Sequence, residues 1–188
     1  MRLAALAWTV ERTPTVDAFA ARLDRALGDL AAQGVDLVML PEYAGVEVGA
    51  ARAAGCGARA EVTETAVLAS ALEDAMAAVA ARHGLWLLGG SLPVQEGGRL
   101  VNRATLFASD GRRAVQRKGR MTRFEVEEWG VASSGPPVAI ETPWGRLGIA
   151  ICYDAEFAPI VRAMVSACTW LVLVPACTDS RAGATRVT

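Results

Sequence analysis

The chain has a single histidine, His83, among its 188 residues. Zinc sites combine several histidine and cysteine ligands, so one histidine makes such a site hard to assemble. The four cysteines, Cys56, Cys152, Cys168 and Cys177, include no pair with C-x-x-C spacing. Cys56, Cys168 and Cys177 fit small buried hydrophobic residues, which is the common role of a free cysteine. The sequence therefore predicts no metal site.

Long apolar runs are also missing. A membrane span needs about 18 uncharged apolar residues in a row, and no segment of the chain reaches that length. The first ten residues carry one arginine and a short apolar run, whereas a signal peptide needs a longer segment and a small-residue cleavage site. We interpret this segment as a strand and expect a cytoplasmic protein that does not contact a membrane.

The charges are balanced, with a formal net charge of -1. Nucleic-acid-binding domains carry a net basic footprint. Basic residues do gather between Arg112 and Arg123, but Glu125, Glu127 and Glu128 follow at once. This pattern is typical of a solvated, charged edge strand, which resists aggregation. We therefore expect no nucleic-acid partner.

Apolar segments alternate between strand and helix patterns along the chain. Hydrophobic residues make up 53% of the sequence, and the length fits one domain, residues 1–188. A helix is predicted to start with Thr13 as its cap and Pro14 in its first turn, and to stop at Gly34. Residues 44–62 are predicted to form a loop that could include a short helix. The other predicted helices are 64–82 and 157–168, and the predicted strands are 2–10, 35–40, 85–92, 101–108, 113–118, 138–142, 146–151 and 170–174.

Buried strands separated by helices indicate an α/β fold in which helices cover a sheet. Ser109-Asp110-Gly111-Arg112 separates two extended runs, which is a hairpin signal. Pro143-Trp144-Gly145 forms a second such connection. Hairpins join antiparallel strands, so we expect mixed sheets.

Cys152 is the residue that stands out chemically. It ends the apolar run Gly148–Ile151 and a helix is expected shortly after it. Unpaired N–H groups at a helix start favour a thiolate, which is the nucleophilic form of cysteine. The same groups could hold a developing oxyanion. An equally simple interpretation is that Cys152 is the buried end of a strand.

A nucleophilic cysteine needs a base, which is usually histidine. His83 lies before Gly84 at the predicted end of a helix, where a basic residue has a structural role. A carboxylate is then the better candidate for the base. Glu42 directly follows the buried strand 35–40 and Pro41, and strand ends are where α/β sheets place ligand sites. The alternative is that Glu42 is a loop carboxylate facing solvent.

Three segments together resemble the nitrilase superfamily of carbon–nitrogen hydrolases. They are Leu40-Pro41-Glu42-Tyr43, then Arg117-Lys118 with Met121-Thr122-Arg123-Phe124-Glu125, and then Ile151-Cys152-Tyr153-Asp154-Ala155-Glu156-Phe157. They occur in the family's order, and the resemblance extends from the first strand to Val174-Pro175-Ala176-Cys177.

The resemblance implies a catalytic triad, with Glu42 as general base, Lys118 as the charge-stabilising residue and Cys152 as nucleophile. It also implies that Glu125 is an additional active-site carboxylate and that the Tyr153 backbone N–H joins Lys118 in the oxyanion site. Glu127 and Glu128 are less well placed for the role of Glu125.

The same resemblance implies an α-β-β-α sandwich that usually dimerises, so a homo-oligomer is expected. The implied chemistry cleaves a small-molecule amide or nitrile through a thioester and needs no cofactor. Family members usually continue for several strands and helices past the point where this sequence stops, which predicts a fold that is incomplete at its C-terminus.

Other functions fit some of these residues. Amide-hydrolysing, nitrile-hydrolysing and acyl-transferring members share the triad, and the segment from Asp154 to Phe157 resembles amidase-like branches more than true nitrilases. A truncated, non-catalytic interaction protein of the same fold is a second hypothesis. A nucleotide-binding module is a third, based on Gly89-Gly90 after a strand, but the spaced glycines of a phosphate loop are missing.

Overall fold

A six-stranded mixed sheet forms the N-terminal part of the molecule. The computed structural model describes residues 1–178 and residue 185. In this sheet β1, β2 and β3 are parallel, and β5 runs antiparallel to β3, β4 and β6. The path of neighbours is β1-β2-β3-β5-β4, with β6 also pairing with β5. The strands span Leu3–Ala5 (β1), Leu37–Met39 (β2), Trp86–Leu88 (β3), Leu92–Glu96 (β4), Arg99–Phe107 (β5) and Arg113–Arg117 (β6).

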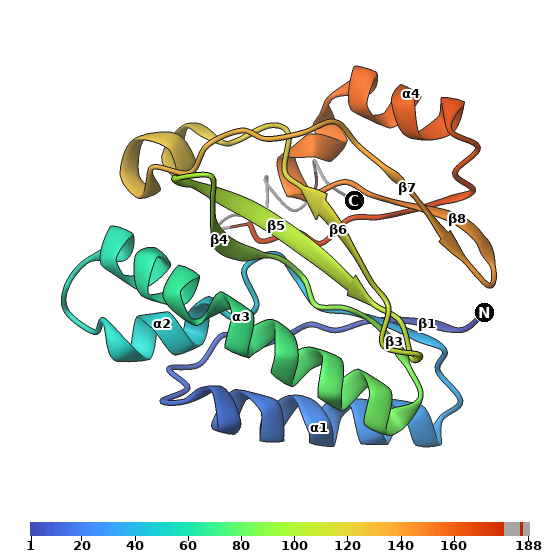
Figure 1. The fold of residues 1–188 in the computed structure, drawn as a ribbon, viewed down its shortest axis with the longest axis horizontal. Helices are drawn as coiled ribbons and strands as arrows, with labels where there is room; N and C mark the ends of the chain where they lie inside the picture. Colours follow the sequence, from blue (N-terminus) through green and yellow to red (C-terminus); the bar gives the residue numbers. More distant parts are fainter. Residues whose placement is uncertain (179–184, 186–188) are drawn as a thin grey trace.

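A second sheet of three strands lies against the first (Figure 1). Its order is β7-β8-β9, with β7 antiparallel and β9 parallel to β8. These strands span Ala139–Thr142 (β7), Gly145–Ile149 (β8) and Leu171–Leu173 (β9). The helices are Val16–Ala32 (α1), Val46–Arg52 (α2), Ala58–His83 (α3) and Ala158–Ser166 (α4), with a π-helix at Glu125–Trp129 (η1) and a 3-10 helix at Cys152–Glu156 (η2).

Side-chain alternation along the strands separates the layers, because neighbouring residues of a strand point to opposite faces. Val38 and Leu87 face α1 and α3 in one core cluster. Leu37 and Leu88 face the second sheet in another cluster. The helices contribute Phe19, Leu23, Leu27, Leu72 and Met76 to the first cluster, and the second sheet contributes Ile140, Leu147, Ile149 and Leu173 to the other.

The helix α4 covers the outer face of the second sheet. Leu147 and Ile149 point to the inner core, so Gly148 between them points outward. A Cβ atom at Gly148 would lie 2.9 Å from Met164 Sδ, which shows how closely α4 packs on the strand. The layers are thus helices, sheet, sheet and helix (Figure 1), which confirms the predicted α/β sandwich with mixed sheets.

The predicted N-terminal elements were partly wrong. The first strand covers only Leu3–Ala5 instead of residues 2–10. The first helix is capped by Thr15, whose Oγ1 accepts the Ala18 N–H at 3.1 Å. Thr13, the predicted cap, instead donates to the buried Glu47 carboxylate at 2.8 Å. Local capping preference could not distinguish two threonines two residues apart, because the partner of Thr13 lies on α2.

Two other segments contain more structure than expected. The predicted loop at 44–62 holds the whole of α2 and the start of α3. The predicted strand at 85–92 is two strands, β3 and β4, which are interrupted at Gly89 and Gly90. No helix follows these glycines, so they do not form a phosphate loop. Both hairpins and the strand at the end of the described chain were predicted correctly.

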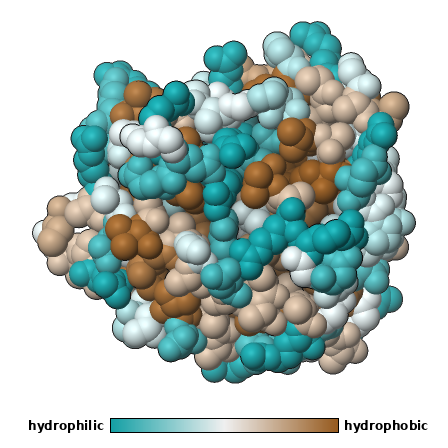
Figure 2. All heavy atoms as spheres, viewed as in Figure 1, coloured by the Kyte–Doolittle hydropathy of each residue, from teal (hydrophilic) through white to brown (hydrophobic). Residues whose placement is uncertain are grey.

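The surface mixes polar and apolar residues. On the face shown in Figure 2, hydrophobic patches are bordered by hydrophilic residues. Arginines of the basic segment 112–123 pair with acidic neighbours, as in Arg113–Asp74 and Arg117–Glu96, which agrees with a solvated edge strand. Within residues 1–178 and 185, no helix has the length and apolar character needed to cross a membrane.

The turn between β3 and β4 packs tightly against the turn that carries Glu42. Gly90 has a left-handed backbone with φ of 68°. A Cβ atom there would lie only 1.9 Å from the carbonyl oxygen of Pro41. Next to it, the Ser91 Oγ accepts the backbone N–H of Tyr43 at 3.2 Å. A residue with a side chain at position 90 would therefore push the two turns apart.

This contact predicts that Gly90→Ala destabilises the fold strongly. The matched control is Gly97→Ala, because Gly97 also has a left-handed backbone with φ of 55°, but a Cβ atom at this position would meet no other atom within 4 Å. We expect a loss in the free energy of unfolding of about 1 to 2 kcal/mol for Gly97→Ala from backbone strain. For Gly90→Ala the added overlap makes the loss about 2 to 5 kcal/mol. Urea denaturation measures both, and equal losses would contradict the close approach.

Candidate active site

Glu42 lies just after the C-terminal end of β2, an interior strand of the first sheet, and only 4% of it is exposed. The chain turns sharply there, since Tyr43 has a left-handed backbone with φ of 60°. The Glu42 Oε1 atom accepts hydrogen bonds from Lys118 Nζ at 2.7 Å and from Asn102 Nδ2 at 2.9 Å. Glu42 is therefore not a carboxylate facing solvent.

Lys118 lies just after β6, and 1% of its side chain is exposed. Its backbone N–H donates to the carbonyl of Asn102 at 2.9 Å, which continues the ladder between β5 and β6. Its ammonium contacts Glu42 at 2.7 Å and both carboxylate oxygens of Glu125 at 2.8 and 2.7 Å. Removing a charge from water is costly, so a buried ammonium requires such partners.

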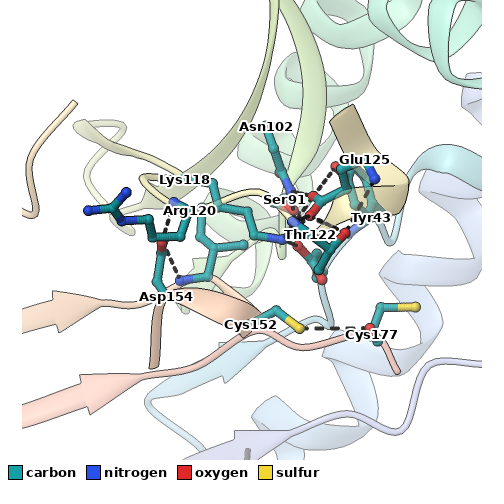
Figure 3. Close-up of polar contacts among 12 residues, drawn as sticks. Tyr43, Ser91, Asn102, Lys118, Arg120, Thr122, Glu125, Cys152, Asp154 and Cys177 are labelled. Carbon is teal, nitrogen blue, oxygen red and sulfur yellow. Dashed lines mark hydrogen bonds and ion pairs between the residues drawn. The ribbon is translucent and has the colours of Figure 1, made fainter. Parts of the chain in front are cut away.

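Glu125 is the first residue of η1 and is also buried. Its Oε2 atom accepts the backbone N–H of Thr122 at 2.8 Å and the Thr122 hydroxyl at 2.9 Å. The Tyr43 hydroxyl donates to Oε1 at 2.7 Å. Glu127 and Glu128, by contrast, are exposed. The structure thus brings Glu125, and neither of the following glutamates, to Lys118 (Figure 3).

Cys152 follows β8 and begins η2, with a left-handed backbone of φ 47°. Its N–H donates to the Pro175 carbonyl at 3.0 Å, and its thiol donates to the Cys177 carbonyl at 3.8 Å. The thiol lies on the same side of the site as Lys118 and the carboxylates (Figure 3). The charges of Glu42 and Lys118 both act on the pKa of this thiol, so three segments that are distant in the sequence lie near one sulfur atom.

The ionisation of Cys152 differs from the expectation. A helix start was expected to lower the pKa of the thiol, but burial and the negative charge of Glu42 raise the pKa of Cys152 to about 12. The helix that follows is one short 3-10 segment of five residues, and its N–H groups do not offset the desolvation. At neutral pH the resting thiol is therefore protonated.

The two glutamates differ although they share one lysine. Burial raises the pKa of Glu42, and nearby Glu125 adds to this effect against the attraction of Lys118. Burial also acts on Glu125, but Lys118 together with the donors from Thr122 and Tyr43 lowers the pKa of Glu125 below the usual value. Environments that separate the pKa values of two carboxylates are typical of acid–base sites. Of the two carboxylates, Glu42 therefore binds a proton more readily than Glu125.

Lys118 remains a cation in this environment. Burial alone would lower the pKa of Lys118, but Glu42 and Glu125 raise it above the usual value. For Tyr43, burial raises the pKa of the hydroxyl well above its usual value, so the hydroxyl keeps the proton that it donates to Glu125.

Asp154 connects the segment after Lys118 to the segment before Cys152. Its buried carboxylate accepts the N–H groups of Arg120 at 2.8 Å, Gly119 at 3.1 Å and Ile151 at 3.2 Å. Burial raises the pKa of Asp154, and these three donors partly offset the effect. One carboxylate therefore fixes the distance between the two loops that carry the ammonium and the thiol (Figure 3).

Tyr153, expected to contribute its backbone N–H, follows Cys152 in η2, and its ring packs edge-on against Phe157 at 4.9 Å.

His83 lies outside the site and contacts Asp24 at 2.9 Å, which confirms its structural role at the end of α3. Cys56, Cys168 and Cys177 are exposed, so the expectation that they are buried was wrong. Among the described residues no cluster of three potential metal ligands occurs.

Asn102 was not among the residues that the sequence singled out. It is the chain's single asparagine and interrupts the apolar pattern of β5, which is a signal that could have been used. Tyr43 and Thr122 were quoted within motifs without a role of their own. Their partner, Glu125, is far from Tyr43 along the chain, and no local pattern relates them.

Comparisons with known proteins identify the family of the chain. The family model described as "Carbon-nitrogen hydrolase" matches residues 2–184. The chain is 33% identical over 109 residues to "Probable hydrolase YhcX" of Bacillus subtilis, which covers 58% of this chain and 21% of that protein. It is 28% identical over 162 residues to "Omega-amidase NIT2" of Danio rerio, which covers 82% of this chain and 56% of that protein.

The fold is similar to solved amidase structures. An amidase from Nesterenkonia sp. AN1, solved in complex with acrylamide, matches with a TM-score of 0.78 and 23% identity. The match covers 98% of this chain and 68% of that one. The chain spans about half the length of the zebrafish relative and a smaller share of the bacterial one. Because the family model matches nearly the whole sequence, the chain belongs to the carbon-nitrogen hydrolase family.

Proposed function

We propose that the chain hydrolyses a carbon–nitrogen bond of a small-molecule amide, with Cys152 as nucleophile, Glu42 as general base and Lys118 as the stabiliser of the oxyanion. The observation that carries the proposal is the buried Lys118 ammonium, which contacts both Glu42 and Glu125 beside the Cys152 thiol. A nucleophile, a base and a cation in mutual reach are the elements of covalent acyl-transfer chemistry.

In the first half-reaction Glu42 takes the Cys152 proton while the sulfur attacks the amide carbon. The C=O π electrons move to oxygen, and the resulting anion is stabilised by Lys118 and by the Tyr153 N–H. The C–N bond then breaks, and the leaving nitrogen receives the proton from Glu42. A thioester with Cys152 remains. Because the resting thiol has a pKa of about 12, it is a weak nucleophile until a base removes its proton.

In the second half-reaction water attacks the thioester. Glu42, assisted by Glu125, accepts a proton from this water, and the C–S bond breaks to give a carboxylic acid. The proton returns to the Cys152 sulfur, which restores the resting site. The raised pKa of Glu42 suits this exchange, because a base works best when its pKa lies closer to the working pH.

The choice of an amide over a nitrile or an acyl acceptor is supported by the relatives. The zebrafish relative is named an omega-amidase and the Nesterenkonia protein an amidase. The competing hypothesis, a non-catalytic protein of the same fold, predicts that the Cys152 thiol reacts no faster than an ordinary buried cysteine. Self-association and cytoplasmic location stay predictions of the sequence.

The first test compares Cys152→Ala and Glu42→Gln with the unaltered chain on a panel of small aliphatic amides. We expect ammonia release to be lost in Cys152→Ala. In Glu42→Gln we expect kcat to fall about 100-fold or more, which is the usual contribution of a general base. A coupled assay for ammonia measures both, and release that persists in Cys152→Ala would end the proposal.

A reactivity measurement complements the turnover assay. Iodoacetamide labelling at pH 7, read peptide by peptide in a mass spectrometer, reports each thiol separately. Glu42→Gln should slow the labelling of Cys152 about tenfold or more, because loss of the base that removes the thiol proton outweighs the lower thiol pKa that follows when the Glu42 charge is removed. Labelling of the exposed Cys56 is the internal control and should not change. Equal Cys152 labelling in both chains would favour the non-catalytic hypothesis.

A further prediction concerns pH. Glu42 must be ionised to accept a proton, so kcat/KM should rise with pH through a limb that lies above the usual glutamate pKa of about 4.3. Glu125→Gln removes a negative neighbour that contributes to the raised pKa of Glu42. The midpoint of the limb should then move to lower pH, whatever the loss in rate. A pH–rate profile from pH 4 to pH 9 measures this shift, and an unmoved or raised midpoint would contradict the assignment of the base.

A further inference from the structure

Asn102 lies between the two carboxylates of the site. Its side chain projects from β5 and is fully buried. The Nδ2 amide donates to Glu42 Oε1 at 2.9 Å and to Glu125 Oε1 at 3.3 Å. The Nδ2 amide therefore binds carboxylates from two different segments of the chain, and Figure 3 shows Asn102 beside Glu125.

The orientation of this amide is set by the carboxylates. If the oxygen and nitrogen of the side chain were exchanged, Asn102 Oδ1 would face two carboxylate oxygens, and acceptors repel each other. In the observed orientation none of the described residues donates to Oδ1. A buried carbonyl without a partner is costly, so this residue is placed for its donor end.

We propose that Asn102 is a positioning residue that holds Glu42 and Glu125 on either side of the Lys118 ammonium and keeps the Glu42 carboxylate directed at Cys152. This inference rests on the proposed function. In this inference the neutral Asn102 side chain binds the two carboxylates, Glu42 and Glu125. These two like charges would otherwise separate, because a single ammonium contacts both.

The neutrality of the amide matters for the chemistry. The ionisable groups around Glu42 are Lys118 from the end of β6, Glu125 from η1, Cys152 from η2 and the neighbouring Tyr43. A second cation at position 102 would favour the ionised form of Glu42 further and weaken it as a base. An amide donates to both carboxylates without adding a charge, so Glu42 keeps its affinity for a proton.

The backbone of the same residue positions the third group. The Asn102 carbonyl accepts the Lys118 N–H at 2.9 Å as part of the pairing between β5 and β6. Substitution of the side chain leaves this bond in place. The side-chain contribution can therefore be measured separately from the placement of the lysine.

The test compares Asn102→Leu and Asn102→Asp with Thr105→Val. Thr105 lies on the same strand, is also buried and donates to a different carboxylate, Glu73, at 2.7 Å. The control thus removes a buried hydrogen bond to a carboxylate outside the site. All variants are first checked by circular dichroism and thermal unfolding, and Asn102→Asp, which is nearly isosteric, keeps the test open if Asn102→Leu does not fold.

We expect kcat to fall about tenfold or more in Asn102→Leu, as for the loss of a hydrogen bond to a charged group, with KM changed far less. The acid limb of the pH–rate profile should move to higher pH, because Glu42 loses a donor that favours its ionised form. Asn102→Asp should move the limb further in the same direction, since it adds a third carboxylate. Thr105→Val should leave the limb in place.

The pH dependence of Cys152 labelling by iodoacetamide gives a readout that does not require turnover. Labelling that depends on Glu42 but is unchanged in Asn102→Leu and Asn102→Asp would overturn the positioning role and leave the proposed function intact. Labelling that does not depend on Glu42 would overturn both. A limb that moves equally in Thr105→Val would reduce Asn102 to a structural residue and also overturn the inference.

Discussion

The buried ammonium of Lys118 is the contact on which the rest of the site depends. It is almost fully enclosed and contacts Glu42 and Glu125 at 2.7 to 2.8 Å. Desolvation of three charged groups costs several kcal/mol for each ion unless every one is paired and hydrogen-bonded. The ends of β2 and β6 and the start of η1 therefore have to converge to within hydrogen-bonding distance. The close approach of Gly90 to Pro41 fixes the turn that carries Glu42, and the Asp154 carboxylate fixes the segment after Lys118 relative to the segment before Cys152.

The charge balance of this cluster explains why two similar carboxylates behave differently. Two glutamates and one lysine leave an excess negative charge, which neutral donors distribute unequally. Glu125 accepts from Thr122 and Tyr43 in addition to Lys118, so it is stabilised as an anion. Glu42 has fewer donors and a raised pKa. The site thus combines an anion with a lowered pKa, a cation, a carboxylate with a raised pKa and a protonated thiol, which is the combination that the proposed base-assisted attack requires.

Much of the architecture was predictable from local patterns. Apolar periodicity identified the helices α1, α3 and α4, and the turn residues identified both hairpins. The motifs around Glu42, Lys118 and Cys152 predicted the family, and the family model confirms it. The errors occurred where a residue distant in the sequence determines the local structure. Thr13 bonds to Glu47 instead of capping α1. The predicted loop 44–62 contains α2 and the start of α3, which pack together at Gly49, where a Cβ atom would lie too close to Thr65.

The sequence by itself determined most of the helices and strands, because helix and strand periodicity are local properties, and it supplied the chemical groups of the site. Only the tertiary structure decided their ionisation. The expected thiolate is a neutral thiol, since burial and the charge of Glu42 outweigh the short helix that begins at Cys152. Likewise Asn102 gains its place between two carboxylates only when β5 lies beside the ends of β2 and β6. Desolvation and the distances between charges depend on the folded arrangement in space, and the order of residues along the chain does not contain them.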